Sequence, residues 1–332
     1  MLGSACHCPT KTIFMNNKHV TIADIARETG YSMMTVSRAF NNPDKVSEKT
    51  LAKILEKAEE LDFHPNKVAR SLALKCTNVV HVYIPKELSA TEPFVTQTVA
   101  AIGERLGENG YSFLLSRELP HRVTCDGVIV MGVNKEAEDK LASLQIEKPV
   151  VLFGNNDKIP AWVDVDNYAG QKLAVRYLID KGCKHIVYLS APLYMNYAKE
   201  RLQGYKDEMA EWQRESCAFE CIDNNVLAGY EGAKKLLEMG MSVDGIVCAT
   251  DAIAVGCTRL LAEMGVEIPK DISVVGFDGF GYENMTNPRL TTIKQPLYEV
   301  GVCLADNLLA MLDDQQPIRS KILPKLVVNE SA

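Results

Sequence analysis

The sequence predicts an α/β protein with an N-terminal all-α helix-turn-helix headpiece and a larger domain of two doubly wound parallel-sheet lobes. Near the N-terminus, two short amphipathic helix patterns are joined by a glycine. From Asn78 onward, apolar strand segments alternate with helical segments, which is typical of parallel sheets with helices on both faces. The length of 332 residues is enough for two or three domains.

The first helix pattern begins after Thr21, which can cap the helix, and Asp24 follows three residues later in capping-box spacing. One face of this segment is apolar and carries Ile22, Ile25 and Ala26. Gly30 occupies the position where the helix must stop and turn, because glycine tolerates the positive φ required there. A helix that ends at Gly30 is therefore predicted.

The second helix pattern covers Met33 to Asn41, with Ser32 as its cap. Val36 and Phe40 are four residues apart and are expected to face inward. The residues then left at the surface are Met33, Met34, Thr35, Ser37 and Arg38. Two helices with such a turn are typical of the helix-turn-helix, whose second helix enters a DNA major groove. Double-stranded DNA is therefore the predicted partner.

A third helix is predicted after Pro43, with Ser47 as its cap. Its expected apolar stripe consists of Leu51, Ile54, Leu55, Ala58 and Leu61. Pro65 then ends the helical region, and Asn66 can cap a short cationic segment over residues 67–75. On length alone this segment is expected to be a solvated linker, because an isolated helix this short is marginal in water.

The large domain shows seven strand patterns, at residues 79–84, 111–115, 127–131, 150–153, 185–189, 245–249 and 273–277. Helix patterns lie between them, at residues 94–108, 169–181, 202–212, 229–239 and 253–264. Ligands of such sheets bind outside the carboxyl ends of the strands. A ligand site between two lobes is therefore expected.

The net charge of −7 is unevenly distributed along the chain. Residues 18–75 carry +2, whereas residues 76–332 carry −10. Attraction to phosphate is local, since salt screens charges beyond about 10 Å. An acidic large domain is therefore compatible with DNA binding by the basic headpiece.

No apolar run is long enough to span a bilayer, and no segment resembles a signal peptide. The ten cysteines show no disulfide framework, which favours a cytoplasmic protein without membrane association. Cys6, His7 and Cys8 offer three ligands with no matching second cluster, so neither a metal nor a cofactor is expected. Residues 1–17 are expected to be a disordered or vector-derived extension.

Several motifs resemble the lactose/galactose repressor family of bacterial transcription regulators. In the headpiece they are Thr35-Val36-Ser37-Arg38, Asn41 and the segment 63–72, Phe-His-Pro-Asn-Lys-Val-Ala-Arg-Ser-Leu. In the large domain they are residues 163–170, 177–182, 276–278 and 290–296. The resemblance covers about residues 20–328. It implies a ligand-responsive regulator, expected to be a repressor of a carbohydrate operon that a sugar inducer releases.

The resemblance also implies a periplasmic-binding-protein-like effector domain whose two lobes are joined by three crossing strands. In the family, the hinge becomes helical when two copies meet over the DNA minor groove, and a leucine at the position of Leu72 wedges between base pairs. A homodimer on a palindromic operator is therefore expected. The expected boundaries are headpiece 18–64, hinge 65–77 and effector domain 78–332, with lobe 1 at about 78–162 and 294–320 and lobe 2 at about 163–293 and 321–332.

Two sets of site residues are expected from the motifs and the resemblance. Those expected to contact DNA are Thr21, Ser32, Met33, Met34, Thr35, Ser37, Arg38, Asn41, Ser47, Thr50, Asn66, Ala69, Arg70 and Leu72. Those expected to bind the ligand are Phe94, Arg201, Asn224, Asp251 and Asp278. Two of the ligand residues have alternative explanations, since Asp251 can simply cap the helix 253–264 and Phe94 can belong to the core.

Three features depart from the family pattern. Only ten residues, 117–126, connect two strands where a parallel crossover usually needs about a dozen and most relatives carry a helix. Asn224 stands where many relatives place an aromatic residue that stacks on the ligand. Met33 and Met34 occupy the variable recognition positions, and neither can form a bidentate hydrogen bond to a base, which leaves contacts to thymine methyls.

Two other classes of function compete with this one. An enzyme with a DNA-binding appendage is disfavoured, because the sequence lacks nucleophile-elbow, phosphate-loop and His-Glu-x-x-His motifs. A regulator controlled by a phosphorylated phosphocarrier protein, or by a small molecule other than a sugar, is the alternative.

Overall fold

The computed structural model describes residues 20–41, 43–63, 76–86, 88–118, 120–132 and 146–332, together with Asp139, Leu141, Ser143 and Leu144. The chain divides between Cys76 and Thr77 into two compact units. The first unit contains the headpiece, described at residues 20–41 and 43–63, and ends at Cys76, whereas the large unit covers residues 77–332. The predicted extension 1–17 and the predicted contacts of Asn66, Ala69, Arg70 and Leu72 lie outside the described residues.

The headpiece is a cluster of helices around a small core in which Ile25, Val36 and Ile54 are fully buried. The predicted capping box is confirmed, because Thr21 N–H donates to Asp24 Oδ2 over 2.9 Å and Asp24 N–H donates to Thr21 Oγ1 over 3.4 Å. Gly30 ends the first helix with a φ of 75°. The elements are α1 (Ile22–Thr29), α2 (Met33–Asn41), the 3-10 turn η1 (Pro43–Lys45) and α3 (Glu48–Glu60).

One expectation for the third helix is wrong. Leu55 was expected in the apolar stripe, but it is 45% exposed. It lies one residue after Ile54 and is therefore turned by about 100° on the helix, away from the core that Ile54 and Ala58 enter.

The first lobe of the large unit is built on an all-parallel sheet of order β11-β5-β4-β3-β1-β2. Its strands are β1 (Val79–Tyr83), β2 (Ser112–Ser116), β3 (Gly127–Met131), β4 (Val150–Phe153), β5 (Ala161–Val165) and β11 (Arg319–Ile322). Two helices, α5 (Pro93–Glu108) and α11 (Leu297–Leu312), pack on each other and on this sheet. No helix was predicted at α11.

The connection from β2 to β3 is as short as predicted. Its described residues contain one 3-10 turn, η2 (Pro120–Arg122), and no α-helix. The connection passes β1, which lies between β2 and β3 in the sheet. As an edge strand with little covering it, β2 exposes its apolar residues, with Phe113 at 40%, Leu114 at 45% and Leu115 at 43%.

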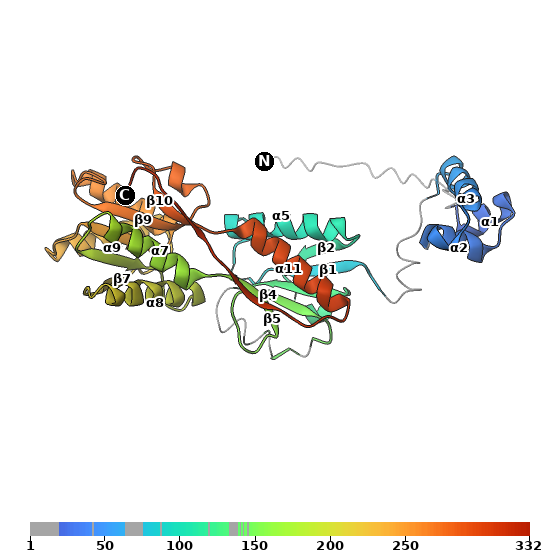
Figure 1. Cartoon of the computed structure of the whole chain (residues 1–332), viewed down its shortest axis with the longest axis horizontal. Coiled ribbons are helices and arrows are strands. Elements are labelled where there is room, and N and C mark those ends of the chain that lie inside the picture. Colours follow the sequence, from blue (N-terminus) through green and yellow to red (C-terminus); the bar gives the residue numbers. More distant parts are fainter. Residues whose placement is uncertain are drawn as a thin grey trace, which may run out of the picture. The chain divides into compact units, whose positions relative to one another are not determined.

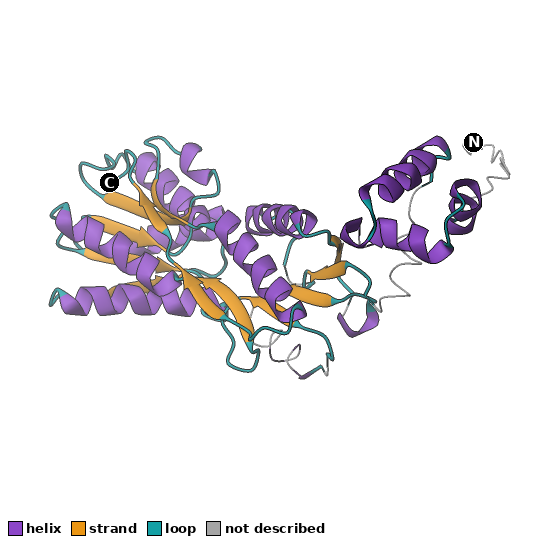
Figure 2. Cartoon of the chain, turned by 45° about the vertical axis from the view of Figure 1, so that its right-hand side comes forward, coloured by secondary structure: helices purple, strands orange, loops and turns teal. Residues whose placement is uncertain are grey.

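The second lobe is built on a sheet of order β12-β10-β9-β8-β6-β7. Helices flank both faces of its strands, as Figure 2 shows, with α7 and α8 packed together on one face and α9 and α10 on the other. The strands are β6 (Ile186–Ser190), β7 (Cys217–Glu220), β8 (Gly245–Cys248), β9 (Ser273–Asp278), β10 (Thr291–Lys294) and β12 (Lys325–Val327). The helices are α7 (Asn167–Asp180), α8 (Asn196–Glu211), α9 (Val226–Glu238), α10 (Asp251–Glu263) and the 3-10 turn η3 (Tyr282–Asn284).

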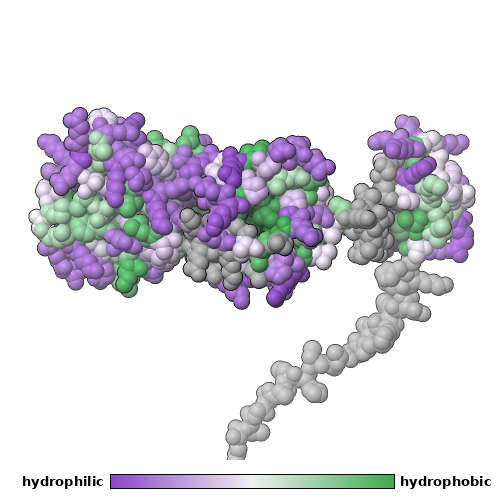
Figure 3. Space-filling model, turned by 90° about the horizontal axis from the view of Figure 1, so that it is seen from below, coloured by the Kyte–Doolittle hydropathy of each residue, from purple (hydrophilic) through white to green (hydrophobic). Residues whose placement is uncertain are grey.

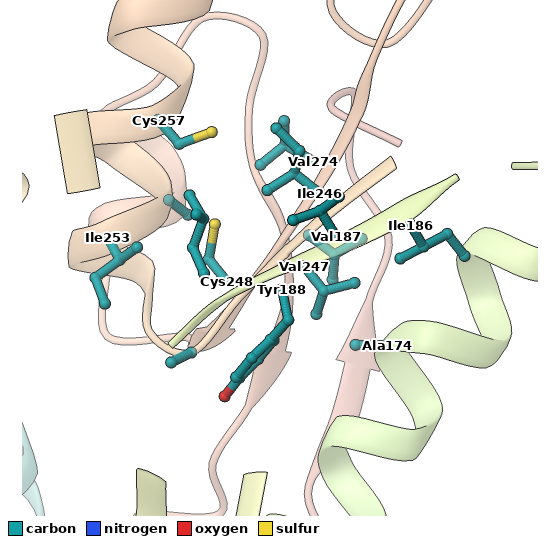
Figure 4. Close-up of a cluster of buried hydrophobic side chains, with 14 of the residues drawn as sticks. Ala174, Ile186, Val187, Tyr188, Ile246, Val247, Cys248, Ile253, Cys257 and Val274 are labelled. Atoms are coloured by element: carbon teal, nitrogen blue, oxygen red, sulfur yellow. The ribbon is translucent and has the colours of Figure 1, made fainter. Parts of the chain in front are cut away.

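The core of the second lobe lies between these helix layers and the strands. In Figure 4, Ile253 and Cys257 of α10 point toward the strands from one side and Ala174 of α7 points toward them from the other. Between them lie fully buried side chains such as Tyr188 and Cys248. The surface of the large unit is polar, unlike this core. The face in Figure 3 is mainly hydrophilic and carries separate apolar patches. None of the described helices is long and apolar enough to cross a membrane.

Three chain crossings join the two lobes (Figure 1). They come after β5, β10 and β11, each of which leaves its own sheet at its carboxyl end. The carboxyl ends of both sheets therefore face the other lobe. The same geometry makes β12 antiparallel to β10, because the chain that leaves β11 runs into the second lobe while the parallel strands there run out of it.

The crossings lie a few residues later than the sequence suggested. Residues 163–165 and 321–322 were expected in the second lobe, but they remain in the first sheet, where Val163 pairs with Ser320 and Val165 pairs with Ile322. Likewise, Lys294 was expected in the first lobe but remains paired with Asp278 in the second. Strand pairing between distant segments sets these limits, and no local residue pattern marks them.

We expect Gly256→Ala to destabilise the second lobe. A methyl group at Gly256 would overlap with the carbonyl oxygen of Val226 in α9, so α9 and α10 would have to move apart. The free energy of unfolding, measured by urea denaturation, should fall by about 1–3 kcal/mol.

Gly107→Ala is the matched control, because it also lies in a helix but has no atom within 4 Å of the added carbon. Its stability should be equal to or slightly above that of the wild type. Equal unfolding midpoints for Gly256→Ala and the wild type would contradict the close packing of α9 on α10.

Candidate functional site

The first candidate surface is the start of α2 in the headpiece. Met33 and Met34 are 60% and 63% exposed, and Arg38 is exposed one turn later. Ser32 caps the helix as predicted, with its Oγ accepting from Thr35 N–H over 3.1 Å. Ser37 and Thr35 are half-buried, and Asn41 is the last residue of the helix. The arrangement presents an exposed helix face at the end of a tight turn, which suits insertion into a DNA groove.

Thr21 and Ser47 act as caps at the starts of α1 and α3. The Thr21 hydroxyl donates to Asp24 Oδ2 over 2.7 Å, and the hydroxyls of Ser47 and Thr50 are 2.8 Å apart. Both caps are exposed, so the backbone N–H groups of two helix starts lie at the surface. Such helix starts bind anions such as DNA phosphates.

The second candidate site is centred on Arg201 of α8, whose side chain is only 3% exposed. Its Nε donates to Asn167 Oδ1 over 2.9 Å, and its Nη1 donates to Ala249 O over 2.5 Å and to Asp278 Oδ1 over 3.1 Å. The guanidinium also lies 3.5 Å from the ring centre of Phe277 and 4.7 Å from that of Tyr197. Within the described part of the chain, Nη2 has no hydrogen-bond partner.

Asp278 completes this ion pair at the carboxyl end of β9. Its Oδ1 also accepts from Gln295 Nε2 over 2.8 Å, at the second crossing. Its φ of 137° is a conformation that side-chain-bearing residues rarely adopt, so these bonds hold a strained residue in place. Burial raises the pKa of the Asp278 carboxyl, and the charge of Arg201 opposes that shift.

Asn224 lies beside Arg201 but its amide is already engaged. Its Nδ2 donates to the Tyr197 hydroxyl over 3.1 Å, and its Oδ1 accepts from Thr250 Oγ1 over 2.6 Å. Burial raises the pKa of Tyr197, so its hydroxyl stays protonated. Tyr197 and Thr250 therefore connect Asn224 to the site around Arg201.

Asp251 has a different environment from the one expected. Thr250 caps α10, and Asp251 is its first helical residue, so the alternative that Asp251 caps this helix is wrong. The carboxylate is fully buried, with Oδ1 accepting from Thr292 Oγ1 over 2.6 Å and Oδ2 accepting from Gly279 N–H over 2.8 Å. Asp251 therefore joins α10 to β10 and to the turn after β9.

Phe94 is the one predicted ligand residue in the first lobe. It is half-buried at the start of α5, and its ring centre lies 4.5 Å from that of Phe153 at the end of β4. It also packs on the core of the first lobe. Both of its predicted roles, ligand contact and core residue, are compatible with this position.

A polar contact between the lobes was not predicted. Glu200 of α8 accepts from Lys321 Nζ of β11 over 2.8 Å and from Asn155 Nδ2, after β4, over 3.2 Å. Glu200 precedes Arg201, so neighbouring residues of α8 bind the other lobe and the second sheet. No sequence pattern predicts this contact between the lobes, because Asn155 and Lys321 lie 45 and 121 residues from Glu200.

Comparisons with known proteins find matches to both the headpiece and the large unit. The description "Bacterial regulatory proteins, lacI family" matches residues 21–66, and "Periplasmic binding protein-like domain" matches residues 175–332. The HTH-type transcriptional regulator YvdE of Bacillus subtilis is 32% identical over 94% of this chain and 99% of its own length. The chain belongs to the lacI family. It is therefore a ligand-responsive, DNA-binding transcriptional regulator, and its family consists of regulators rather than enzymes.

Two further proteins show how far this lacI-family likeness extends. The ribose operon repressor of Halalkalibacterium halodurans is 30% identical over 94% of this chain and 96% of its own length. The crystal structure of the lac repressor dimer bound to operator and the anti-inducer ONPF is 27% identical, with a TM-score of 0.80 over 95% of this chain and 99% of that one. The likeness thus includes the headpiece and both lobes.

We expect the Asp251 carboxyl to make the stability of this lacI-family protein pH-dependent. Burial, aided by the charge of Asp278, raises its pKa from 3.8 to about 7. Between these values the folded chain holds a proton that the unfolded chain has lost, so this group's contribution to stability falls as the pH rises. Asn cannot titrate, and it can accept from Gly279 N–H and donate to Thr292 Oγ1.

The free energy of unfolding is measured in urea for the wild type and for Asp251→Asn. The difference between the two values should change between about pH 4 and about pH 7. The wild type should lose stability relative to the variant as the pH rises. A difference that stays constant over this window would show that Asp251 is charged in the folded protein at all these pH values.

Proposed function

We propose that this regulator represses a carbohydrate-utilisation operon and that a sugar inducer, bound at Arg201 and Asp278, releases it from a palindromic operator. The observation that carries the proposal is the buried Arg201–Asp278 pair at the carboxyl ends of the second sheet. A family relative that represses a ribose operon supports the carbohydrate class.

The chemistry of the pair suits a sugar hydroxyl, which both donates and accepts hydrogen bonds. Arg201 Nη2 supplies an N–H donor without a partner among the described residues, and Asp278 supplies a charged acceptor. The half-buried Phe94, backed by the buried Phe153, supplies an apolar face in the opposite lobe on which a sugar ring can pack. Asn224, already bonded to Tyr197 and Thr250, positions its neighbours or exchanges one of these bonds for a ligand hydroxyl.

The proposed DNA contacts are those of the start of α2 and of the helix caps, with the hinge as a second element. We propose that Leu72 wedges between base pairs of the minor groove when two hinges meet. Ligand binding then acts by changing the relative position of the lobes and hence of the two hinges. The loss of affinity is limited by the ligand's preference for one lobe arrangement over the other.

The regulator is proposed to act as a homodimer, and the β2 edge is the surface that supports this. An edge strand offers unpaired backbone groups, and here three consecutive apolar residues of β2 are also exposed. A second copy of the chain would cover them and would bring a second headpiece to the other half of a palindrome.

Leu115→Lys should therefore shift the protein toward a monomer in sedimentation equilibrium at micromolar concentration, because a charge would be buried at the contact. Met239→Lys, at a 59% exposed position at the end of α9, is the control and should leave the dimer intact. A dimer of undiminished stability in Leu115→Lys would place the interface elsewhere.

The inducer proposal is tested by a gel shift on the gene's own upstream DNA at fixed salt, over a panel of mono- and disaccharides. One sugar should abolish the shift. Asp278→Asn should then need at least about tenfold more of that sugar, because a charged acceptor is lost, while its affinity for DNA without sugar should change much less. Asp314→Asn, exposed at a positive φ that Asn tolerates, is the control.

A shift that persists with every sugar would instead favour a protein effector or another small molecule. A normal sugar response in Asp278→Asn would remove this carboxylate from the ligand site while leaving the repressor function in place.

A further inference from the structure

A Gly-Phe-Gly turn follows β9 and carries an aromatic side chain from the second lobe onto the first. Phe280 is half-buried and packs against the buried core of the first lobe, as Phe94 and Leu88 do. It is not among the described side chains that pack on the core of its own lobe. The ring therefore joins the two lobes through apolar area that it buries in the first one.

The backbone of this turn is fixed to the second lobe on both sides of Phe280. Gly279 and Gly281 have φ angles of 70° and 106°, which glycine adopts readily. Gly279 N–H donates to Asp251 Oδ2 over 2.8 Å, and Gly281 N–H donates to Glu283 Oε2 over 2.7 Å. The turn is therefore anchored to its own lobe while its central side chain contacts the other.

A second contact with the first lobe lies beside Arg201. Glu200, the preceding residue, accepts on Oε1 from Lys321 Nζ over 2.8 Å and from Asn155 Nδ2 over 3.2 Å. The side chains of Lys321 and Glu200 are 28% and 25% exposed, so water screens their ion pair only in part. Both members of the Arg201–Asp278 pair thus have a close neighbour in sequence that contacts the first lobe.

We propose that Phe280 and Glu200 form a clasp that holds the lobes in the arrangement that the sugar opposes. A ligand hydroxyl that donates to Asp278 competes with the hydrogen bonds from Arg201 and Gln295. Asp278 leads directly into the turn that carries Phe280, so a change at its carboxylate disturbs the apolar contact two residues away. The clasp then sets how much sugar is needed to release DNA. This inference rests on the proposed function.

The test measures the sugar concentration that releases half of the full-length protein from its operator. The operator is selected from a randomised duplex pool, the sugar is the one that acts in the saccharide panel, and release is followed by fluorescence anisotropy at fixed salt. Phe280→Ala should need about tenfold less sugar, because the apolar contact is lost. Phe280→Leu keeps an apolar side chain and should respond almost like the wild type. Glu200→Gln should need about threefold less, since the charge is lost but the amide oxygen can still accept.

Two control variants carry the same substitutions at positions that contact only the second lobe. Phe219 of β7 is also half-buried, but it packs on the core of its own lobe. Glu211 lies on α8, as Glu200 does, but it pairs with Lys172 of α7. Phe219→Ala and Glu211→Gln should therefore leave the sugar requirement unchanged, even where Phe219→Ala lowers the unfolding midpoint in urea.

Phe280→Ala combined with Glu200→Gln tests the clasp without any sugar. This double variant should bind the operator at least about threefold more weakly than the wild type, because the arrangement that binds DNA loses both contacts. An unchanged or higher sugar requirement in Phe280→Ala would overturn the proposal, as would an undiminished operator affinity in the double variant. If no sugar releases the wild type, the sugar proposal fails, while the double variant still decides whether the clasp exists.

Discussion

The large unit depends on one buried ion pair, Arg201 with Asp278. A buried charge is costly unless hydrogen bonds compensate it, and here each partner has several. Arg201 connects α8 to the first crossing through Asn167 and to the end of β8 through Ala249. Asp278 connects the same cluster to the second crossing through Gln295. The pair therefore joins the proposed ligand site to two of the three segments that link the lobes.

This arrangement explains how a small molecule can act on the lobes. A hydroxyl that accepts from Arg201 or donates to Asp278 competes with bonds that reach both crossings, so binding and lobe position are coupled. The contact of Glu200 with Lys321 and Asn155 adds a second link, because it joins α8 directly to the first lobe. Since Glu200 and Arg201 are adjacent, one helix carries both the proposed ligand contact and the contact between lobes.

The departures of this chain from its family concern surfaces rather than the core. The short connection between β2 and β3 accompanies an exposed apolar edge strand. In the headpiece, the exposed side chains of Met33 and Met34 lack the groups for bidentate hydrogen bonds to bases.

The sequence by itself determined the local elements and the family. Thr21, Ser32 and Ser47 are caps as predicted, and β3 and β4 begin and end at the predicted residues, because caps and apolar runs are properties of neighbouring residues. The family motifs also brought Arg201 and Asp278 to attention. Their hydrogen-bond partners could not be predicted from the sequence, because Arg201 bonds to residues 34, 48 and 77 positions away.

Only the tertiary structure decided the roles that depend on such distant contacts. It made Asp251, predicted as a ligand residue with a helix cap as the alternative, a buried link to Gly279 and Thr292, which lie 28 and 41 residues away. Both polar atoms of the Asn224 amide have hydrogen-bond partners in the folded protein. The boundaries between the lobes lie where β5 and β11 stop pairing. A residue pattern records which groups are available, but burial and long-range pairing decide which of them remain free to bind a ligand.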